Sequence, residues 1–313
     1  MSQEAFDVCR SVAENMSRVV LGKPQVVRRV VMALIAGEHL LLEDVPGVGK
    51  TLIARALAAS IGGSHARLQF TPDLLPSDIT GTTIYRTDER RFEFTPGPIF
   101  SQVVLADEIN RAPPRTQSAL LEAMAEGSVS IDGETRPLPQ PFIVVATQNP
   151  FEYEGTYPLP ESQLDRFMMR IGVGYPSRGV EREVLTSHRT GEPVTSLRSV
   201  ADGEAVMRVR EFVRGVRVDE SIADYVLDIV DATRRFDGFE AGVSTRGALS
   251  LYRAAQASAV TDGRDFVTPD DVKSIAVETL AHRVLPEGVL QGGRRDRIES
   301  QVRDLVEQIP VPI

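Results

Sequence analysis

The sequence has one cysteine, no tryptophan and no long apolar run. Because Cys9 has no second cysteine to pair with, a framework of intrachain disulfides is excluded. No stretch approaches the roughly 20 consecutive apolar residues that a membrane-spanning helix needs, and the N-terminus lacks the basic-then-apolar profile of a secretory signal. These absences argue against an integral membrane protein, with no membrane span, and favour a protein of the reducing cytoplasm.

An excess of positive charge is also missing, since the formal net charge is −9. An acidic total disfavours nucleic-acid binding over the whole surface and favours protein partners, although a basic strip inside a pore is compatible with it. The length of 313 residues exceeds what one compact core usually holds, so we expect two packed domains.

The first half of the chain alternates short apolar runs with helical segments. The runs are rich in leucine and valine, which is typical of parallel strands that are buried on both faces of a sheet. They occupy residues 39–43, 67–70, 102–107, 142–147 and 167–173. We therefore predict an α/β fold whose sheet has five parallel strands flanked by helices.

Between these strands, the sequence marks one helix and one hairpin. Pro114 begins a segment with helical spacing of apolar residues, and Gly127 ends it. The next segment, 128–137, alternates small polar and apolar residues around Asp132-Gly133, which is a strong signal for a two-residue hairpin turn. A projecting β-hairpin is expected there.

Beyond about Gly174 the pattern becomes helical throughout. One of these helices has a clear start at Thr268-Pro269-Asp270-Asp271. The segment Gly174-Tyr175-Pro176-Ser177 is the expected hinge. We therefore predict a nucleotide-binding core over 1–174 and an all-helical C-terminal domain over 175–313.

The stretch EDVPGVGKT, residues 43–51, stands between the first strand and a helical segment. Gly47 and Gly49 allow the backbone to curl so that its N–H groups face phosphates. Lys50 can then reach the outer phosphates, and the Thr51 hydroxyl can bind Mg²⁺. The predicted nucleotide-binding segment is Pro46, Gly47, Val48, Gly49, Lys50, Thr51 and Leu52.

This stretch departs from the strict phosphate-loop pattern at one position, because Asp44 stands where the first glycine is expected. Aspartate also accepts turn conformations, so Asp44 can hold the first bend while its carboxylate points away from the nucleotide. A plain Gly/Pro turn between a strand and a helix is the alternative interpretation, and other motifs have to decide between the two.

Two further strand ends carry polar side chains. In VVLADEINRA, 103–112, the strand delivers Asp107 and Glu108 to its carboxyl end, where ligands of open α/β sheets bind. Asp107 would hold Mg²⁺, and Glu108 would orient and deprotonate the attacking water. The strand FIVVATQNP ends at Asn149, which could hydrogen-bond the γ-phosphate or that water. A solvated acidic turn and a structural asparagine before Pro150 are the alternatives, but the order of the motifs favours a site.

Taken together, these motifs resemble the MoxR group of AAA+ ATPases over nearly the whole chain. The resemblance rests on LEDVPGVGKT, QFTPDLLPSDITGT, FTPGPIF, VVLADEINRAPPRTQSALLEAMAEG, VVATQNPFEYEGTYPLPESQLDRF and STRGALSLYRAA. It implies an AAA+ P-loop NTPase core with a helical lid, and an ATPase with a chaperone-like remodelling role. Within that group, aspartate at position 44 is an accepted variant of the loop.

The resemblance also assigns roles that spacing does not show. Arg166 matches the arginine finger that reaches a neighbouring subunit's nucleotide, with Arg170 as the second candidate and a surface pair with Asp165 as the plain alternative. Arg246 matches the second sensor, which contacts the γ-phosphate from the lid; an exposed arginine at a helix start is the alternative. Val20, Leu21 and Gly22 resemble the segment that backs the adenine.

Two inserts resemble the loops that point toward the pore or top face of related rings, 71–97 and 128–137, and both are candidate substrate-contact loops. Tyr85, Phe92 and Phe94 of the first insert are expected to pack it onto the body, with gripping of a polypeptide as the alternative. Arg86, Arg90 and Arg91 are interleaved with acids, as in a solvated loop.

The implied cofactors are ATP and Mg²⁺, and the implied assembly is a homo-oligomeric ring of six subunits. The resemblance further implies a partner that carries a von Willebrand factor A domain and a protein client. A DNA-translocating motor is one alternative, but the 128–137 hairpin sets Arg136 against two acids, so no nucleic acid is expected. A non-hydrolysing scaffold is the other, and the presence of Glu108 argues against it.

The histidines and the cysteine show no pattern that indicates a metal site or a nucleophile. His39, His65, His188 and His282 lack metal-ligand spacing, and core or surface histidine is the expectation for each. Cys9 has no histidine partner in the pattern, so we expect a small packed residue and not a nucleophile.

Overall fold

The structure is a computed structural model that describes residues 2–150, 155–187, 192–288 and 294–312. A five-stranded sheet lies at its centre, in the order β2-β5-β8-β1-β9, and every neighbouring pair is parallel. Its strands are β1 (Leu40–Glu43), β2 (His65–Gln69), β5 (Val103–Asp107), β8 (Ile143–Gln148) and β9 (Met169–Ile171). Each falls within or beside a segment that the sequence predicted, so the α/β fold is confirmed.

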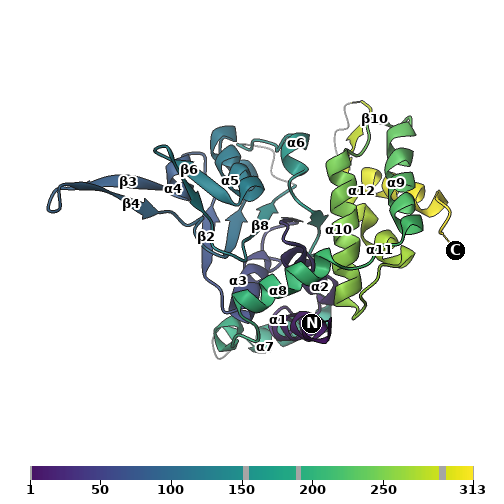
Figure 1. Cartoon of the computed structure of the whole chain (residues 1–313), viewed down its shortest axis with the longest axis horizontal. Coiled ribbons are helices and arrows are strands. Elements are labelled where there is room, and N and C mark those ends of the chain that lie inside the picture. Colours follow the sequence, from purple (N-terminus) through teal and green to yellow (C-terminus); the bar gives the residue numbers. More distant parts are fainter. Residues whose placement is uncertain (1, 151–154, 188–191, 289–293, 313) are drawn as a thin grey trace.

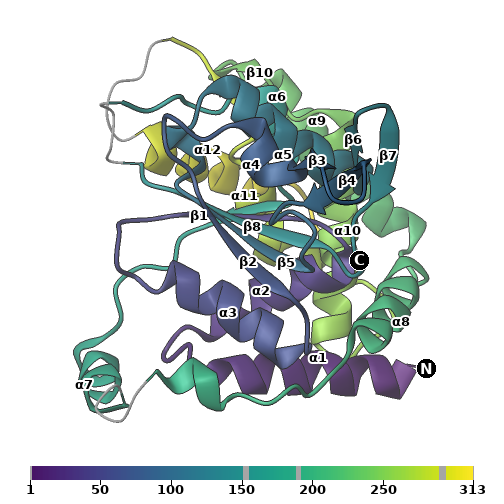
Figure 2. The same ribbon diagram turned by 90° about the vertical axis from the view of Figure 1, so that its left-hand side faces the viewer.

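Apolar side chains on both faces of the strands explain this sheet. Leu40 and Leu42 of β1 belong to one hydrophobic cluster, and Leu41 between them belongs to another, because successive side chains of a strand point to opposite faces. Figure 2 shows the two layers of helices that complete these clusters. One face carries α1 (Ser2–Ser17), α2 (Pro24–Ala36) and α3 (Lys50–Ser60); the other carries α4 (Pro76–Thr80) and α5 (Pro114–Glu126).

The predicted helix and hairpin that follow β5 are both present. Helix α5 begins at Pro114 and ends before Gly127, whose φ of 61° closes the helix in the left-handed conformation. Strands β6 (Ser128–Ile131) and β7 (Glu134–Pro137) then pair around Asp132 and Gly133, with φ values of 53° and 82°. Two positive φ angles in succession define a type I′ turn, which matches the twist of a hairpin.

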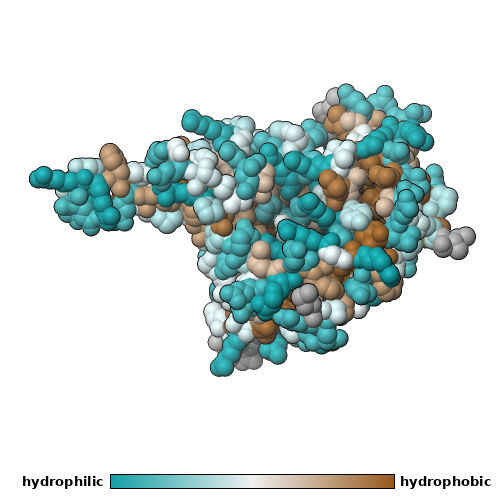
Figure 3. Space-filling model, in the orientation of Figure 1, coloured by the Kyte–Doolittle hydropathy of each residue, from teal (hydrophilic) through white to brown (hydrophobic). Residues whose placement is uncertain are grey.

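A second hairpin, β3 (Gly81–Arg86) with β4 (Arg91–Pro96), projects far from the body in Figures 1 and 3. The expectation that its aromatic residues pack the insert onto the body is wrong for two of the three. Tyr85 is 52% exposed and Phe92 is 74% exposed, and their rings contact each other at a tilt of 59°, with the ring centres 5.1 Å apart. Only Phe94 packs toward the body, against Phe100. The hairpin is therefore too long for its outer aromatic residues to reach the core.

The part after Gly174 is helical, as predicted, with one short sheet that the sequence did not reveal, β10 (Phe239–Ala241) with β11 (Leu285–Pro286). Its short 3-10 turn η3 covers Pro193–Ser196. Its helices are α7 (Arg178–Ser187), α8 (Gly203–Arg214), α9 (Glu220–Arg235), α10 (Thr245–Thr261), α11 (Pro269–Leu280) and α12 (Arg294–Gln308).

These helices divide between two places in Figure 1. Helix α8 packs on α1 and α2, whereas α9, α11 and α12 gather around α10 beside the β9 edge of the sheet. A capping box between Thr268 and Asp271 confirms the predicted start of α11. The domain boundary at Gly174 itself stays a prediction.

Of the isolated reactive side chains, His39, His282 and Cys9 are buried, and His65 is half-buried. His39 contacts the carbonyl of Met124 and accepts from the Val144 N–H, and His282 contacts the carbonyl of Phe167. Burial lowers the pKa of both imidazoles, so both are neutral core residues, as expected. His188 lies outside the described residues. No helix within the described ranges is both long and apolar enough to cross a membrane.

Cys9 is predicted to be unreactive in the folded protein. Burial raises the pKa of its thiol to about 12, so at pH 8 a fraction of only about 10⁻⁴ would be the reactive thiolate. An aromatic disulfide reagent at pH 8 should therefore label less than about a tenth of the protein in an hour, and all of it in guanidinium chloride. Rapid stoichiometric labelling of the native protein would contradict this burial.

Candidate nucleotide site

The loop between β1 and α3 has the geometry of a phosphate cradle. Gly47 and Gly49 have φ values of 85° and 92°, and a Cβ added at either would meet no atom within 4 Å. These glycines thus border open space, and the first N–H groups of α3, which begins at Lys50, have no partner inside the helix. A helix N-terminus and curled backbone amides facing open space fit the phosphates of a nucleotide.

Lys50 is buried and already held in place at the end of the sheet. Its Nζ donates to the carbonyl of Asp44 at 2.6 Å and lies 3.5 Å from that of Gln148, at the carboxyl ends of β1 and β8. The Thr51 side chain is half-buried in the next position of the helix. The structure therefore brings the predicted segment Pro46 to Leu52 together as one loop and helix turn.

The carboxylate of Asp44 accepts hydrogen bonds from its own loop and from a distant segment of the chain. Its Oδ1 accepts from the Val45 N–H at 2.7 Å, and its Oδ2 accepts from the N–H groups of Val173 and Gly174 at 2.8 and 2.5 Å. The side chain holds the first bend of the loop and bonds to the segment that follows β9. The predicted role in the first bend agrees with these bonds, and the orientation relative to a nucleotide stays a prediction.

Asp107 and Glu108 lie at the carboxyl end of β5, as predicted. Asp107 accepts from the Thr147 hydroxyl at 2.6 Å, and the same hydroxyl accepts from the Glu108 N–H at 2.9 Å. Glu108 has a φ of 58°, a conformation that costs free energy for a residue with a Cβ, and that turns it into the 3-10 turn η1 (Ile109–Arg111). Backbone strain at this position is consistent with a functional residue.

Two residues that the sequence analysis missed hold these acids. Arg67 of β2 donates to Asp107 Oδ2 at 2.6 Å, and Gln69 Nε2 donates to Glu108 Oε2 at 3.0 Å. Arg111 forms an ion pair with the same oxygen of Glu108 at 3.0 Å. The available signal was that Arg67 and Gln69 alternate with Ala66 and Leu68 in this strand, which puts the two polar side chains on one face. The structure adds that Gln69 lies opposite Asp107 in the parallel register.

The other predicted contacts of the nucleotide lie around this centre. Asn149 is buried directly after β8, whose last carbonyl accepts from the Asp44 N–H at 3.2 Å. On the other side, Gly22 lies against α7, because a Cβ there would sit 2.7 Å from Val180. Val20 is buried beside it, so the segment predicted to back the adenine is placed next to the junction with α7.

The three candidate arginines occupy different surroundings. Arg170 forms an ion pair with Glu43 at 3.3 Å in its own subunit, with little of its side chain exposed. Arg166 follows α6 (Glu161–Leu164) and donates to the carbonyl of Leu121 on α5 at 2.6 Å. Arg246 is exposed in the first turn of α10. The structure thus gives Arg170 a partner at the end of β1, and leaves Arg166 at the surface of α5.

Arg246 lies on the same side as Arg166. The capping residue of its helix, Ser244, approaches Asp165 at 3.4 Å, and Arg283 pairs with Asp165 at 2.8 Å. Burial lowers the pKa of Arg283, Asp165 opposes that shift, and Arg246 is near enough to add to it. Asp165 therefore connects the first turn of α10 to the residue beside Arg166.

Magnesium would rely on few protein ligands here. Among the described residues, no three His, Cys, Asp or Glu side chains cluster in a way that could hold a metal ion. The hydroxyl of Thr51 and the carboxylate of Asp107 are the oxygen donors that Mg²⁺ prefers, and in nucleotide sites phosphates and water complete its shell. The donor set therefore fits a cation that arrives with the nucleotide.

The parallel sheet, the phosphate loop and the two acidic residues at the end of β5 together define a P-loop ATPase of the AAA+ class. Family models agree: residues 39–169 match the ATPase family associated with various cellular activities, and residues 231–305 match the AAA lid domain. A crystal structure of a candidate ATPase from Cytophaga hutchinsonii superposes with a TM-score of 0.89 at 37% identity, covering 100% of this chain and 97% of that one.

Comparison with relatives of known sequence identifies the family to which the chain belongs. The chain is 42% identical to Chaperone MoxR1 of Mycobacterium tuberculosis, over 91% of this chain and 77% of that protein. It is 30% identical to Protein MoxR of Methylorubrum extorquens, over 98% and 96%. It is also 49% identical to the uncharacterised protein YeaC of Bacillus subtilis, over 96% and 93%. The chain belongs to the MoxR family of AAA+ ATPases, as its motifs indicated.

Proposed function

We propose that this ATPase hydrolyses ATP with Mg²⁺ between the subunits of a ring, which family resemblance makes six-membered, and remodels a protein client. The observation that carries the proposal is the arrangement around Glu108. Its carboxylate is held by Gln69 and Arg111 at the carboxyl end of β5, beside Asp107 and the loop that ends at Lys50. A fixed carboxylate at that place can orient water for attack on the γ-phosphate.

Each residue has a part in the proposed reaction. The loop amides and Lys50 bind the phosphates, and Thr51 and Asp107 hold Mg²⁺, which neutralises charge that develops on the phosphate oxygens. Glu108 takes the proton of the attacking water, and Asn149 orients that water or the γ-phosphate. The core over 1–174 and the lid over 175–313 are proposed to enclose the nucleotide, with Val20 and Gly22 behind the adenine.

Arg166 is proposed to act from a neighbouring subunit, and Arg246 is proposed to contact the γ-phosphate from the lid. Both lie around Asp165, and Arg166 has a surface position that a second copy can approach. Arg170 is the weaker candidate for the finger, because Glu43 of its own chain already holds it. A guanidinium supplied in trans would stabilise charge on the γ-phosphate only after the ring has formed.

The first test of the proposed function is ATP turnover per subunit over a wide range of protein concentration. If the site is completed between subunits, specific activity should rise at least about tenfold from the dilute monomer to the assembled ring. The oligomer is followed in parallel by light scattering. Turnover per subunit that is independent of concentration, while the oligomer dissociates, would contradict a shared site.

The projecting β3–β4 hairpin is proposed to contact the client. Tyr85 and Phe92 contact each other at the exposed part of the hairpin. Nearer the body, the guanidinium carbon of Arg136 on β7 lies 4.2 Å from the ring centre of Phe94 and holds the hairpin in place. Aromatic side chains held on a rigid support provide contact area at a low cost in conformational entropy. A polypeptide with exposed apolar side chains is the chemistry that this surface suits.

Replacing Tyr85 and Phe92 with serine should weaken binding of a reduced, carboxymethylated model protein about tenfold, since each ring removes a contact of hot-spot type. Binding is measured by fluorescence anisotropy with ATP present. The matched control is Leu227→Ser on α9, which removes a half-exposed apolar side chain from another surface and should leave affinity unchanged. Equal effects of the two changes would rule out the hairpin as the client site.

A DNA-translocating motor receives less support. Arg136 of the β6–β7 hairpin is engaged by Glu134 and by the Phe94 ring, and on the other hairpin Arg86 and Arg91 pair with glutamates. Cations that are neutralised by neighbouring acids add little to phosphate binding. A partner with a von Willebrand factor A domain is a further proposal, and it rests on the family resemblance. A cytoplasmic location is also proposed, and it rests on the single cysteine.

A further inference from the structure

The last residue of β1, Glu43, and the first residue of the phosphate loop, Asp44, are connected to the C-terminal half of the chain by independent contacts. Asp44 bonds to the N–H groups of Val173 and Gly174, in the segment that leads out of β9. Glu43 bonds to Arg295, in the first turn of α12. A nucleotide on the loop would thus lie directly beside one connection to the junction between core and lid and one connection to the lid itself.

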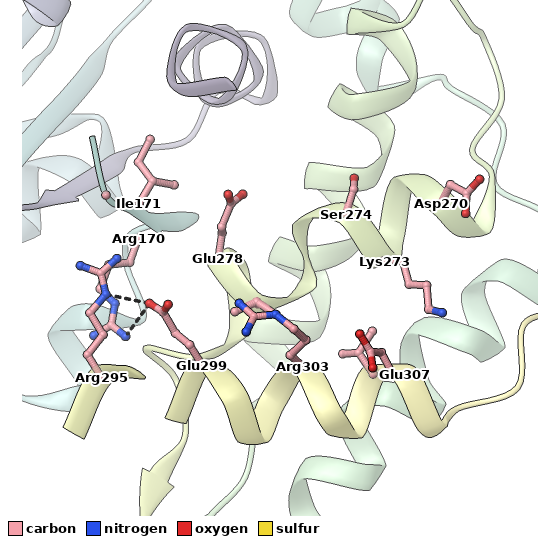
Figure 4. A pocket seen from close by; sticks show the side chains of 13 residues that line it. Arg170, Ile171, Asp270, Lys273, Ser274, Glu278, Arg295, Glu299, Arg303 and Glu307 are labelled. Atoms are coloured by element: carbon pink, nitrogen blue, oxygen red, sulfur yellow. Dashed lines mark hydrogen bonds and ion pairs between the residues drawn. The ribbon is translucent and has the colours of Figure 1, made fainter. Parts of the chain in front are cut away.

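The Glu43 connection is a group of four charged side chains, three of which are visible in Figure 4. Arg295 Nη1 donates to the Glu43 carbonyl at 2.9 Å and lies 3.7 Å from its carboxylate. Glu299 accepts from Arg295 Nε at 2.7 Å and lies 3.8 Å from Arg170, which in turn pairs with Glu43. Glu43 and Arg170 are largely withdrawn from water, so loss of one partner leaves a charge that water does not fully compensate.

These charged contacts lie at the border of a cavity. A cavity of about 650 Å³ lies between β9, α11 and α12, and Arg170, Arg295 and Glu299 are among the residues that line it (Figure 4). Ile171 of β9 and Ile298 and Val302 of α12 are buried in one hydrophobic cluster, so the charged contacts add a polar connection to elements that apolar packing already holds together. Gly172 lies between the two connections, because a Cβ there would be 3.5 Å from Arg295 and 3.6 Å from Asp44.

The carboxylate of Asp44 is not needed for binding phosphate. The strict phosphate-loop pattern has a glycine at this position, so the loop can be formed without any side chain there. Lys50, however, donates to the carbonyl of the same residue at 2.6 Å. A phosphate that attracts the Lys50 ammonium competes with this carbonyl, and a shift of Asp44 is passed to the N–H groups of Val173 and Gly174.

We propose that Asp44 is a positioning residue that transmits the occupancy of the phosphate loop to the junction at Val173 and Gly174, with Glu43 and Arg295 as the second connection to the lid. The nucleotide in this inference rests on the proposed function. The competition for Lys50 supplies the two states: ammonium bound to the Asp44 carbonyl, or ammonium bound to phosphate. When the Lys50 ammonium binds phosphate, the change reaches the junction through the bonds of Asp44 and reaches the lid through the bond between Glu43 and Arg295.

Asp44→Gly is the decisive variant, because it restores the residue of the strict pattern and removes the carboxylate together with the rest of the side chain. Exchange of the Val173 and Gly174 amides with deuterium is measured with and without a non-hydrolysable ATP analogue. In the wild type we expect nucleotide to change the exchange rate of these amides. In the variant their exchange should be roughly tenfold faster and independent of nucleotide, since a charge-assisted hydrogen bond is lost.

The kinetic result separates this role from a structural one. Asp44→Gly should bind the analogue within about threefold of the wild type, while kcat falls about tenfold, because the lid no longer follows the nucleotide. Asp44→Asn keeps one acceptor oxygen and should fall between the two. Arg295→Gln, which leaves the loop intact, should also lower kcat without changing affinity.

Two outcomes would overturn the inference. Junction amides that still respond to nucleotide in Asp44→Gly would show that the carboxylate transmits nothing. Loss of analogue binding in that variant, with an unchanged melting temperature, would show that the carboxylate serves the loop itself. If the wild type hydrolyses no ATP and its junction amides still respond to the analogue, the proposed hydrolysis fails and the coupling stands.

Discussion

Replacing Glu108 with glutamine is expected to lower ATP turnover by roughly 10²- to 10⁴-fold while nucleotide affinity changes by less than about threefold. Glutamine has nearly the same shape, and its oxygen can still accept from Gln69, which donates to Glu108 at 3.0 Å. What the change removes is the negative charge that takes a proton from water. The loss should therefore appear in kcat, because the general base acts in the transition state and not in binding.

The matched control for this variant is Glu122→Gln, which makes the same chemical change at an exposed position of α5. It should hydrolyse ATP at the wild-type rate. Turnover is measured by phosphate release at saturating ATP, and affinity by titration with a fluorescent analogue. If Glu108→Gln kept more than about a tenth of the wild-type kcat, another group would be the base, and the scaffold interpretation would still be excluded.

The core strands and the placement of polar residues at their carboxyl ends could be predicted from the sequence because local patterns determine them. Continuous apolar runs such as that of β5 define a strand buried on both faces, and a polar residue directly after such a run must lie at the ligand-binding edge of the sheet. Asp107, Glu108 and Asn149 follow from this rule alone. The hairpin turn at Asp132-Gly133 follows from backbone conformations that few other residues accept.

Contacts between distant segments could not be predicted in the same way. Asp44 was placed correctly in its loop, but its partners at Val173 and Gly174 are 129 and 130 positions away. Gln69 contacts Glu108 because β2 and β5 are neighbours in the sheet, and strand order is not written in either strand. The exposure of Phe92 depends on how far the hairpin projects, which its composition does not determine.

Arg166→Ala should reduce turnover of the assembled protein by at least about 10³-fold, with nucleotide binding retained. Within the described residues its guanidinium donates to the carbonyl of Leu121, and loss of such a bond should cost little stability. Arg170→Ala should behave differently, because it leaves the Glu43 carboxylate short of a partner and should lower the melting temperature. Arg235→Ala on α9, an exposed arginine far along the chain, is the neutral control.

Mixing two inactive variants shows whether Arg166 acts between subunits. A subunit with Arg166→Ala keeps its own Glu108, and a neighbour with Glu108→Gln can supply the missing arginine. After dissociation and random reassembly at a one-to-one ratio, about a quarter of the interfaces combine an intact base with an intact finger, so activity should return to roughly that fraction of the wild type.

The control mixture combines Lys50→Ala with Glu108→Gln. Both changes damage the site of the subunit that carries them, so no pairing of these subunits yields a complete site and no activity should return. Recovery in the first mixture alone would therefore assign Arg166 to the neighbour's nucleotide. If neither mixture regains activity although rings are present, Arg166 acts on the nucleotide of its own subunit. The same comparison with Arg246→Ala would show whether the two arginines near Asp165 act together.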